Sequence, residues 1–215
     1  MHTYAKLLEK ISGKDNGISR RHLSFDFAHI FKALQLAKIK GHISRDLLKK
    51  ELLLGEGSVK TLIKYLKQTE IIKTTNGGTI LTPNGEKIIS KLLSYIPYEV
   101  DIPKSSITLG RFNYAIVVKD ASNSIKFGIE QRDEAIKSGA IGATTLIFND
   151  DKFLIPGSNF DALDKEPKIH KILLEKLKPE NNDIIIIGSD NQSKKNAELA
   201  SKNAALFTIL NHATH

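Results

Sequence analysis

Basic and hydroxyl side chains recur at helical spacing between residues 58 and 68. Apolar residues there also recur at three- and four-residue spacing, which predicts an amphipathic helix capped by Ser58. Its polar side would carry Lys60, Thr61, Lys64, Tyr65 and Gln68. Such side chains can contact phosphates and base edges, so this helix has the chemistry needed to enter the major groove of double-stranded DNA.

The segments around this helix have the order of a winged helix-turn-helix. Apolar spacing predicts a helix from about Phe27 to Gly41, and Ser44 would cap a second helix over residues 45–53. Asn76-Gly77 between residues 71–75 and 79–81 indicates a hairpin, because both turn residues tolerate positive φ. Thr82-Pro83 then begins another helix. Further DNA contacts are expected from Arg45, Lys49, Lys50 and Ser58, and from the wing residues Lys73, Thr75 and Asn76.

All of the net charge of +8 lies in the first half of the chain. Residues 1–100 contain 17 Lys and Arg against 9 Asp and Glu, whereas residues 101–215 contain 15 of each. A basic half joined to a neutral half favours a polyanion-binding module that carries a second function. Arg45 is the one arginine in residues 23–96, so phosphate contacts should dominate and binding should weaken with salt.

We place a domain boundary near residue 100, within a connection that contains Pro97 and Pro103. The predicted domains are residues 1–100, a winged helix with an N-terminal helix, and residues 101–215. Residues 1–22 are expected to form a short amphipathic helix for packing or dimer contact. A groove-binding Arg20-Arg21 arm is the alternative.

The second half has the pattern of a small α/β domain. Strands are predicted at residues 113–119, 143–148, 152–155, 183–188 and 206–210, and helices at 124–138, 165–177 and 193–205. The fold class is therefore α+β, with a mixed sheet in the second domain and a ferredoxin-like variant as one arrangement.

Arg132 is predicted to lie within a buried stripe formed by Ile125, Ile129 and Ile136. A buried guanidinium needs a partner. This could be Asp120 or Asp190, the stem could reach past the sheet edge, or an anionic ligand could bind in a pocket. The candidate ligand-binding residues are Glu130, Gln131, Arg132, Asp133, Thr144, Thr145, Ser189 and Asp190.

The segment GIEQRDEAIKSGAIGATTLIF, residues 128–148, resembles an archaeal family that joins a winged helix to a domain of unknown function. The shared segments are Gly128, Glu130 to Asp133, and Gly142 to Leu146. The resemblance covers about residues 22–210. It implies an archaeal source and a regulator's role, and it assigns neither a ligand nor catalytic residues.

Signatures of enzymes and metal sites are missing from the sequence. It has no cysteine, no phosphate-binding or dinucleotide loop and no G-x-S-x-G, and His212 and His215 are its nearest approach to a metal pair. We therefore expect no catalytic residue, no metal and no cofactor. No apolar run is long enough for a membrane, so we expect a cytoplasmic protein.

These observations predict a dimeric, sequence-specific transcription regulator that binds double-stranded DNA and senses a small, anionic effector. A winged-helix protein-protein adaptor, and a small metabolite enzyme with a DNA-binding appendage, are the alternatives.

Overall fold

The computed structural model describes residues 24–212 of the chain. The helix and the Arg20-Arg21 arm predicted within residues 1–22 lie outside the described residues. The chain divides into two compact units between Leu92 and Leu93. The predicted first domain ended at Val100. Glu99 and Val100 instead belong to a strand of the second unit's sheet.

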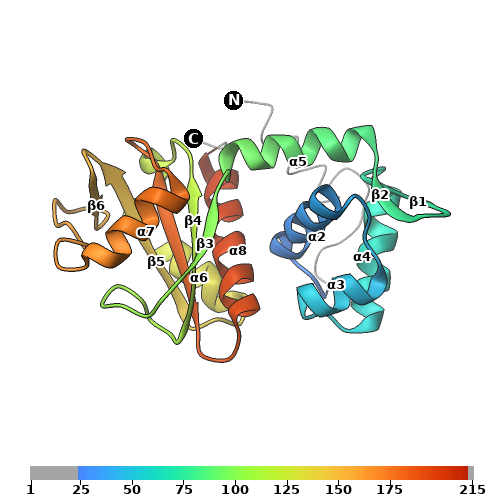
Figure 1. Ribbon diagram of the computed structural model, residues 1–215, viewed down its shortest axis with the longest axis horizontal. Helices are drawn as coiled ribbons and strands as arrows, with labels where there is room; N and C mark the ends of the chain where they lie inside the picture. Colours follow the sequence, from blue (N-terminus) through green and yellow to red (C-terminus); the bar gives the residue numbers. More distant parts are fainter. Residues whose placement is uncertain (1–23, 213–215) are drawn as a thin grey trace. The chain divides into compact units, whose positions relative to one another are not determined.

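The first unit is winged-helix-like, as predicted. It contains helices α2 (Phe27–Lys40), α3 (Arg45–Leu52) and α4 (Glu56–Gln68), strands β1 (Ile72–Thr75) and β2 (Gly78–Leu81), and most of α5 (Pro83–Tyr95) (Figure 1). The predicted cap of α3 is confirmed, because the Ser44 hydroxyl accepts a hydrogen bond from the backbone N–H of Leu47 at 3.1 Å. Helix α2 begins at an Asp26 capping box and ends at Gly41, where φ is 76°.

The hairpin is confirmed, but its turn differs from the expectation. Thr75 pairs with Gly78, so Asn76 and Gly77 form a two-residue loop. The positive φ falls on Gly78, at 121°, and not on the two loop residues. Thr79, which follows Gly78 in β2, forms an antiparallel bridge with Ile43. This bridge attaches the wing to the segment before α3. This attachment fixes the wing beside the helices.

A close approach of backbones holds α5 against the wing. A Cβ atom on Gly85 would lie 2.1 Å from the backbone oxygen of Ile71, so a larger residue would force the two segments apart. The Thr82 hydroxyl accepts from the N–H of Gly85 at 3.0 Å and donates to the backbone oxygen of Glu70 at 2.6 Å. Thr82 thus caps α5, as its sequence predicts, and also joins it to the end of α4.

The second unit is a five-stranded sheet with helices on both faces. Its strands are β3 (Glu99–Ile102), β4 (Phe112–Val118), β5 (Gly142–Asn149), β6 (Lys152–Leu154) and β7 (Ile184–Asp190), in the spatial order β3-β4-β7-β5-β6. Helix α7 (Pro167–Leu177) covers one face, while α6 (Ile129–Lys137) and α8 (Lys194–His212) cover the other (Figure 1). The short helix η3 (Ser122–Ser124) follows β4. All four β-pairings are antiparallel, so the α+β class is confirmed and the mixed sheet was wrong.

Three other elements differ from the sequence prediction. Residues 206–210 continue α8 and form no strand, because Leu206 and Ile209 are buried at helical spacing. Strand β3 was not predicted, because Pro97 and Pro103 flank it and indicated a connection. It is an edge strand, and proline is tolerated there. Helix α6 begins at Ile129 and not at Ser124, because Gly128 adopts a φ of 75° that ends the preceding turn.

Candidate nucleic-acid interface

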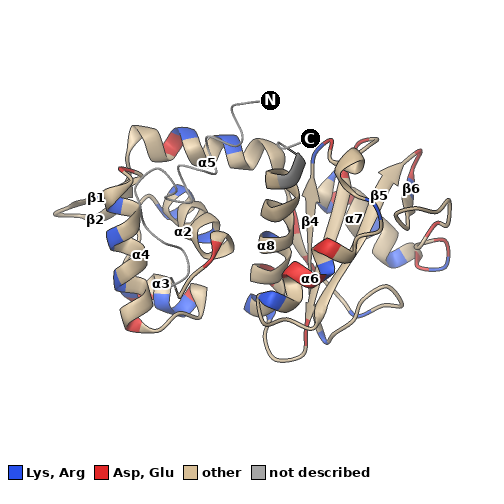
Figure 2. Cartoon of the chain, turned by 180° about the vertical axis from the view of Figure 1, so that it is seen from behind, with Lys and Arg blue, Asp and Glu red and all other residues tan. Residues whose placement is uncertain are grey.

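The surface of α4 that faces away from the core is basic. Val59, Leu62 and Leu66 are buried on its inner side. The outer side exposes a row of polar residues one helical turn apart: Lys60, Thr61, Lys64, Lys67 and Gln68. Figure 2 shows lysine and arginine positions recurring along α4 and α3. A helix with this division is held by its apolar side and leaves its charges available to a polyanion.

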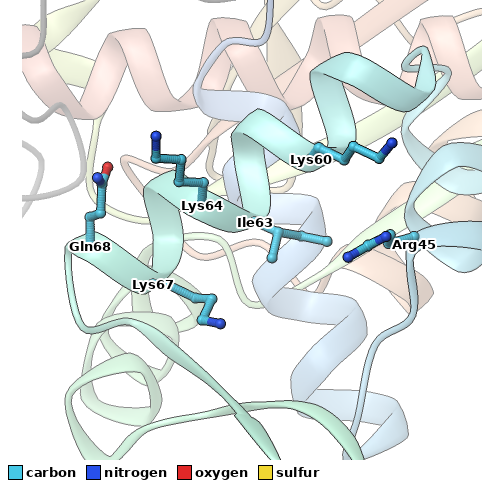
Figure 3. A pocket seen from close by; sticks show the side chains of 6 residues that line it. All are labelled: Arg45, Lys60, Ile63, Lys64, Lys67 and Gln68. Atoms are coloured by element: carbon cyan, nitrogen blue, oxygen red, sulfur yellow. The ribbon is translucent and has the colours of Figure 1, made fainter.

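A shallow depression of about 380 Å³ lies along this face of α4. It is lined by Arg45, Lys60, Ile63, Lys64, Lys67 and Gln68. Arg45 reaches it from the first turn of α3, and its side chain points towards Ile63 (Figure 3). Two consecutive helices therefore contribute cations to one surface, as the helix-turn-helix arrangement requires.

A second depression, of about 590 Å³, lies between the end of α4 and the wing. Lys67 and Lys73 supply its cations, Glu70 supplies a carboxylate, and Thr74, Thr82 and Asn84 supply neutral polar groups. Lys67 lines both depressions, so it joins the helix surface to the wing surface. We call the exposed residues Arg45, Lys60, Lys64, Lys67, Gln68 and Lys73 the basic face.

Most of the charge on the basic face is not neutralised within the described part of the chain. Among the described residues, Lys64, Lys67 and Lys73 make no ion pair. Lys60 differs, because its Nζ lies 2.7 Å from Oε1 of Glu56, one turn earlier. That hydrogen bond and the attraction of Lys60 hold the pKa of the Glu56 carboxyl below its ordinary value, and Lys49 and Arg45 act in the same direction.

Tyr65 and Ser58 do not have the places that the sequence predicted. Tyr65 is only 3% exposed and its ring lies 5.9 Å from that of Phe25, so it belongs to the core and cannot enter a groove. The cap position of α4 is Gly55, and Ser58 lies within the first turn, where its hydroxyl is 2.6 Å from that of Ser24. The cap was misplaced because α4 begins before Ser58, at Glu56.

The remaining predicted DNA contacts are exposed. Lys49 and Lys50 lie on α3, while Lys73, Thr75 and Asn76 lie on the wing. The Thr75 hydroxyl donates to the backbone oxygen of Gly78 at 3.0 Å, which braces the turn. The Thr61 hydroxyl donates to the backbone of Gly57 at 3.0 Å.

Lys67 and Ile63 line the site but were missing from the predicted set. Lys67 lies seven residues after Lys60 and three after Lys64, so all three occupy one helical face. This spacing was a sufficient signal for Lys67. Ile63 is apolar, so a search for polar contacts passes over it, and it is half-buried at the edge of the basic face.

In the second unit, Arg132 is not on a buried stripe. Its side chain is 53% exposed and lies 3.3 Å from Asp133, and Ile129 and Ile136 on the same side are also exposed. The helix instead buries Gln131 and Ala135, which lie on another side of it. Neither Asp120 nor Asp190 pairs with Arg132 among the described residues.

The other candidate ligand residues differ from Arg132 in burial and in their hydrogen bonds. Glu130 is exposed on α6. Gln131 and Thr145 are buried between the helices and the sheet, where Nε2 of Gln131 donates to Thr208 at 3.0 Å. Oε1 of Gln131 and the Thr145 hydroxyl are buried without a hydrogen-bond partner in the described part of the chain.

Three polar side chains near the end of β7 and in β5 stabilise loops. The Ser189 hydroxyl donates to Oδ1 of Asn113 at 2.7 Å. Oδ2 of Asp190 accepts hydrogen bonds from the backbone N–H of Ser193 at 2.9 Å and from that of Gln192 at 2.8 Å. These two bonds close the turn into α8. The Thr144 hydroxyl donates to a backbone carbonyl at 2.7 Å. These hydrogen bonds account for the hydroxyls of Thr144 and Ser189 and for the carboxylate of Asp190.

Within residues 24–212, no group of three His, Asp or Glu side chains could hold a metal ion. In the same part of the chain, every helix is too short or too polar to cross a membrane.

The fold defines a two-unit α+β protein in which a winged-helix-like unit precedes an antiparallel sheet with helices. Residues 109–209, in the second unit, match the family described as Domain of unknown function (DUF4443). The chain is also similar to the solved structure of the hypothetical protein PH0730 from Pyrococcus horikoshii OT3. The two share 29% identity with a TM-score of 0.68, over 86% of this chain and 92% of that one. No protein with a curated description matches the sequence.

Proposed function

We propose that the chain is a double-stranded DNA-binding transcription regulator and that the basic face of its first unit contacts the DNA. The observation that carries this proposal is the set of exposed lysines on α4 and the wing, with Lys64, Lys67 and Lys73 making no ion pair among the described residues. Three neighbouring cations repel one another, and a polyanion bound across them relieves that repulsion.

In this proposal α4 lies in the major groove. Gln68 is suited to hydrogen bonding with a base edge, whereas Lys64 and Lys67 contact the phosphates beside the groove. Lys73 and Asn76 on the wing contact the adjacent backbone. Lys60 must exchange Glu56 for a phosphate, so the Glu56 carboxylate opposes binding.

Residues at the start of α3 and along it extend the contact. Arg45, Lys49 and Lys50 are exposed there and would bind backbone phosphates. With lysine as the main cation, affinity derives mostly from counterion release and sequence preference from few base contacts. One winged helix then reads few bases, so a regulator of this kind requires a dimer for specificity.

An effector site centred on Arg132 gains no support from these contacts, because Arg132 is about half exposed and the Ser189 hydroxyl and the Asp190 carboxylate are hydrogen-bonded within the chain.

The test is fluorescence anisotropy with duplex DNA from upstream of the protein's own coding sequence and with a scrambled duplex, at about 50 mM and about 200 mM salt, a range over which several phosphate contacts change affinity strongly. Tighter binding to the upstream duplex, weakening with salt, is expected. Absence of binding to either duplex at the lower salt would overturn the proposal and favour a protein-protein adaptor.

A further inference from the structure

The outer face of α6 is apolar at its ends and charged at its centre. Ile129 and Ile136 are 49% and 48% exposed, and Arg132 and Asp133 lie between them. At 100° per residue, these four positions share one face of the helix. Figure 2 shows the acidic and basic positions of α6 side by side. We call these four residues the α6 face.

The α6 face continues onto the loop before β4. Three side chains approach Gly142. A Cβ atom on this glycine would lie 3.1 Å from the side chain of Leu109, 3.3 Å from that of Arg132 and 4.0 Å from that of Ile136. Leu109 is itself 49% exposed. Exposed large apolar residues that gather beside one another indicate an interaction surface, whereas isolated ones do not.

We infer that the α6 face is the self-association surface of this chain and that its partner is a second copy packed about a twofold axis. In an antiparallel pair of α6 helices with the axis between Arg132 and Asp133, Ile129 lies opposite Ile136 of the second copy. The same operation places Arg132 opposite Asp133 of the second copy. The face is therefore complementary to itself in both apolar contact and charge, which an isologous interface requires.

The ion pair within one chain supports this arrangement. Arg132 and Asp133 are neighbours in sequence, their closest atoms are 3.3 Å apart and both are about half exposed. Adjacent helical residues do not face one another, so this contact satisfies neither group well. A second copy would offer each of them an opposite charge directly across the interface.

The interface is small, so the dimer is reversible. Stable protein-protein interfaces bury at least about 1,200 Å² in total, and one short helix with a neighbouring loop contributes only part of that area. The inference rests on the proposed function in one respect: a DNA-binding regulator needs a dimer. Its test contains no DNA, so a failure of dimerisation is distinct from a failure of DNA binding.

The first test is sedimentation velocity of the full chain and of two charge variants, Arg132→Asp and Asp133→Arg. The wild type is expected to show a concentration-dependent dimer. Each variant alone places like charges opposite each other twice and should be monomeric. An equimolar mixture of the two restores both opposite-charge pairs and should form a heterodimer.

Matched controls lie on the other face of the sheet. Lys171→Glu and Glu175→Lys on α7 make the same changes in net charge at an exposed pair and should leave the dimer unchanged. A wild type that stays monomeric at every concentration, or a mixture that stays monomeric while the wild type dimerises, would overturn the inference.

A second test keeps the inference falsifiable if a charge variant does not fold. The sequence has no cysteine, so introduced thiols are the only ones. A mixture of Ile129→Cys and Ile136→Cys should form a disulfide-linked dimer under mild oxidation. Ile129→Cys alone should not, because two copies of position 129 would lie further apart than the roughly 7 Å Cα separation that a disulfide spans. Equal cross-linking in both samples would refute the antiparallel pairing.

Discussion

Lys67 gives the sharpest test of the basic face, because it lines both the depression along α4 and the depression beside the wing. Its ammonium makes no ion pair among the described residues, so its full charge is available to a phosphate. Replacing Lys67 with alanine removes one phosphate contact. The slope of log K against log salt should then become shallower by about 0.9.

The expected loss of affinity follows from that slope. If wild type and variant bind alike near 1 M salt, a slope difference of about 0.9 gives an affinity about eightfold weaker near 0.1 M, or roughly 1.2 kcal/mol. The free energy of unfolding should change by no more than about 0.5 kcal/mol, because the side chain is exposed and away from the core.

The assay is fluorescence anisotropy across a salt series, with urea unfolding as the stability measurement. Lys171→Ala is the matched control, because Lys171 is an exposed lysine on α7 in the second unit. It should leave both the slope and the affinity unchanged. An unaltered slope in Lys67→Ala, or an equal change in Lys171→Ala, would refute the assignment of the basic face.

Three further predictions concern other residues of the two units. Glu56→Gln should strengthen duplex binding by up to about eightfold near 0.1 M salt, because it releases Lys60 for a phosphate contact; anisotropy showing weaker binding would contradict this. Tyr65→Ala should lower the free energy of unfolding by about 3–5 kcal/mol, measured in urea, because the ring is buried; full stability with lost DNA binding would instead place it in the groove. Lys202→Met should lower the free energy of unfolding by about 3–5 kcal/mol in the same assay, because Glu99 and Glu198 both lose the fully buried ammonium with which they pair. An unchanged unfolding midpoint would show that these ion pairs do not stabilise the fold.

The first unit was predictable because its signals are local. Ser44, Asn76-Gly77 and Thr82-Pro83 each determine a helix start or a turn within a few residues, and the structure contains the corresponding elements. Lys67 could have been found from the same helical spacing that identified Lys60 and Lys64. Tyr65 was misplaced because an aromatic side chain with a hydroxyl suits either a core or a groove, and only its neighbour Phe25 decides between them.

The second unit was less predictable because tertiary packing determines it. The antiparallel sheet depends on how β7 pairs with both β4 and β5, and nothing in one strand specifies its partner. The orientation of Arg132 depends on which side of α6 packs inwards. Gln131 and Ala135 are buried there, so Arg132 faces outwards. Residues that seemed to form a ligand site, such as Asp190, turned out to close loops.

The most direct test of DNA binding by the basic face is the salt-dependent anisotropy of the wild type beside a variant with Lys64, Lys67 and Lys73 all replaced by alanine. We predict that the wild type binds duplex DNA. The slope of log K against log salt should be shallower by about 2.7 in the variant, because three phosphate contacts are lost. Equal affinity and equal slope for the two proteins would contradict the account.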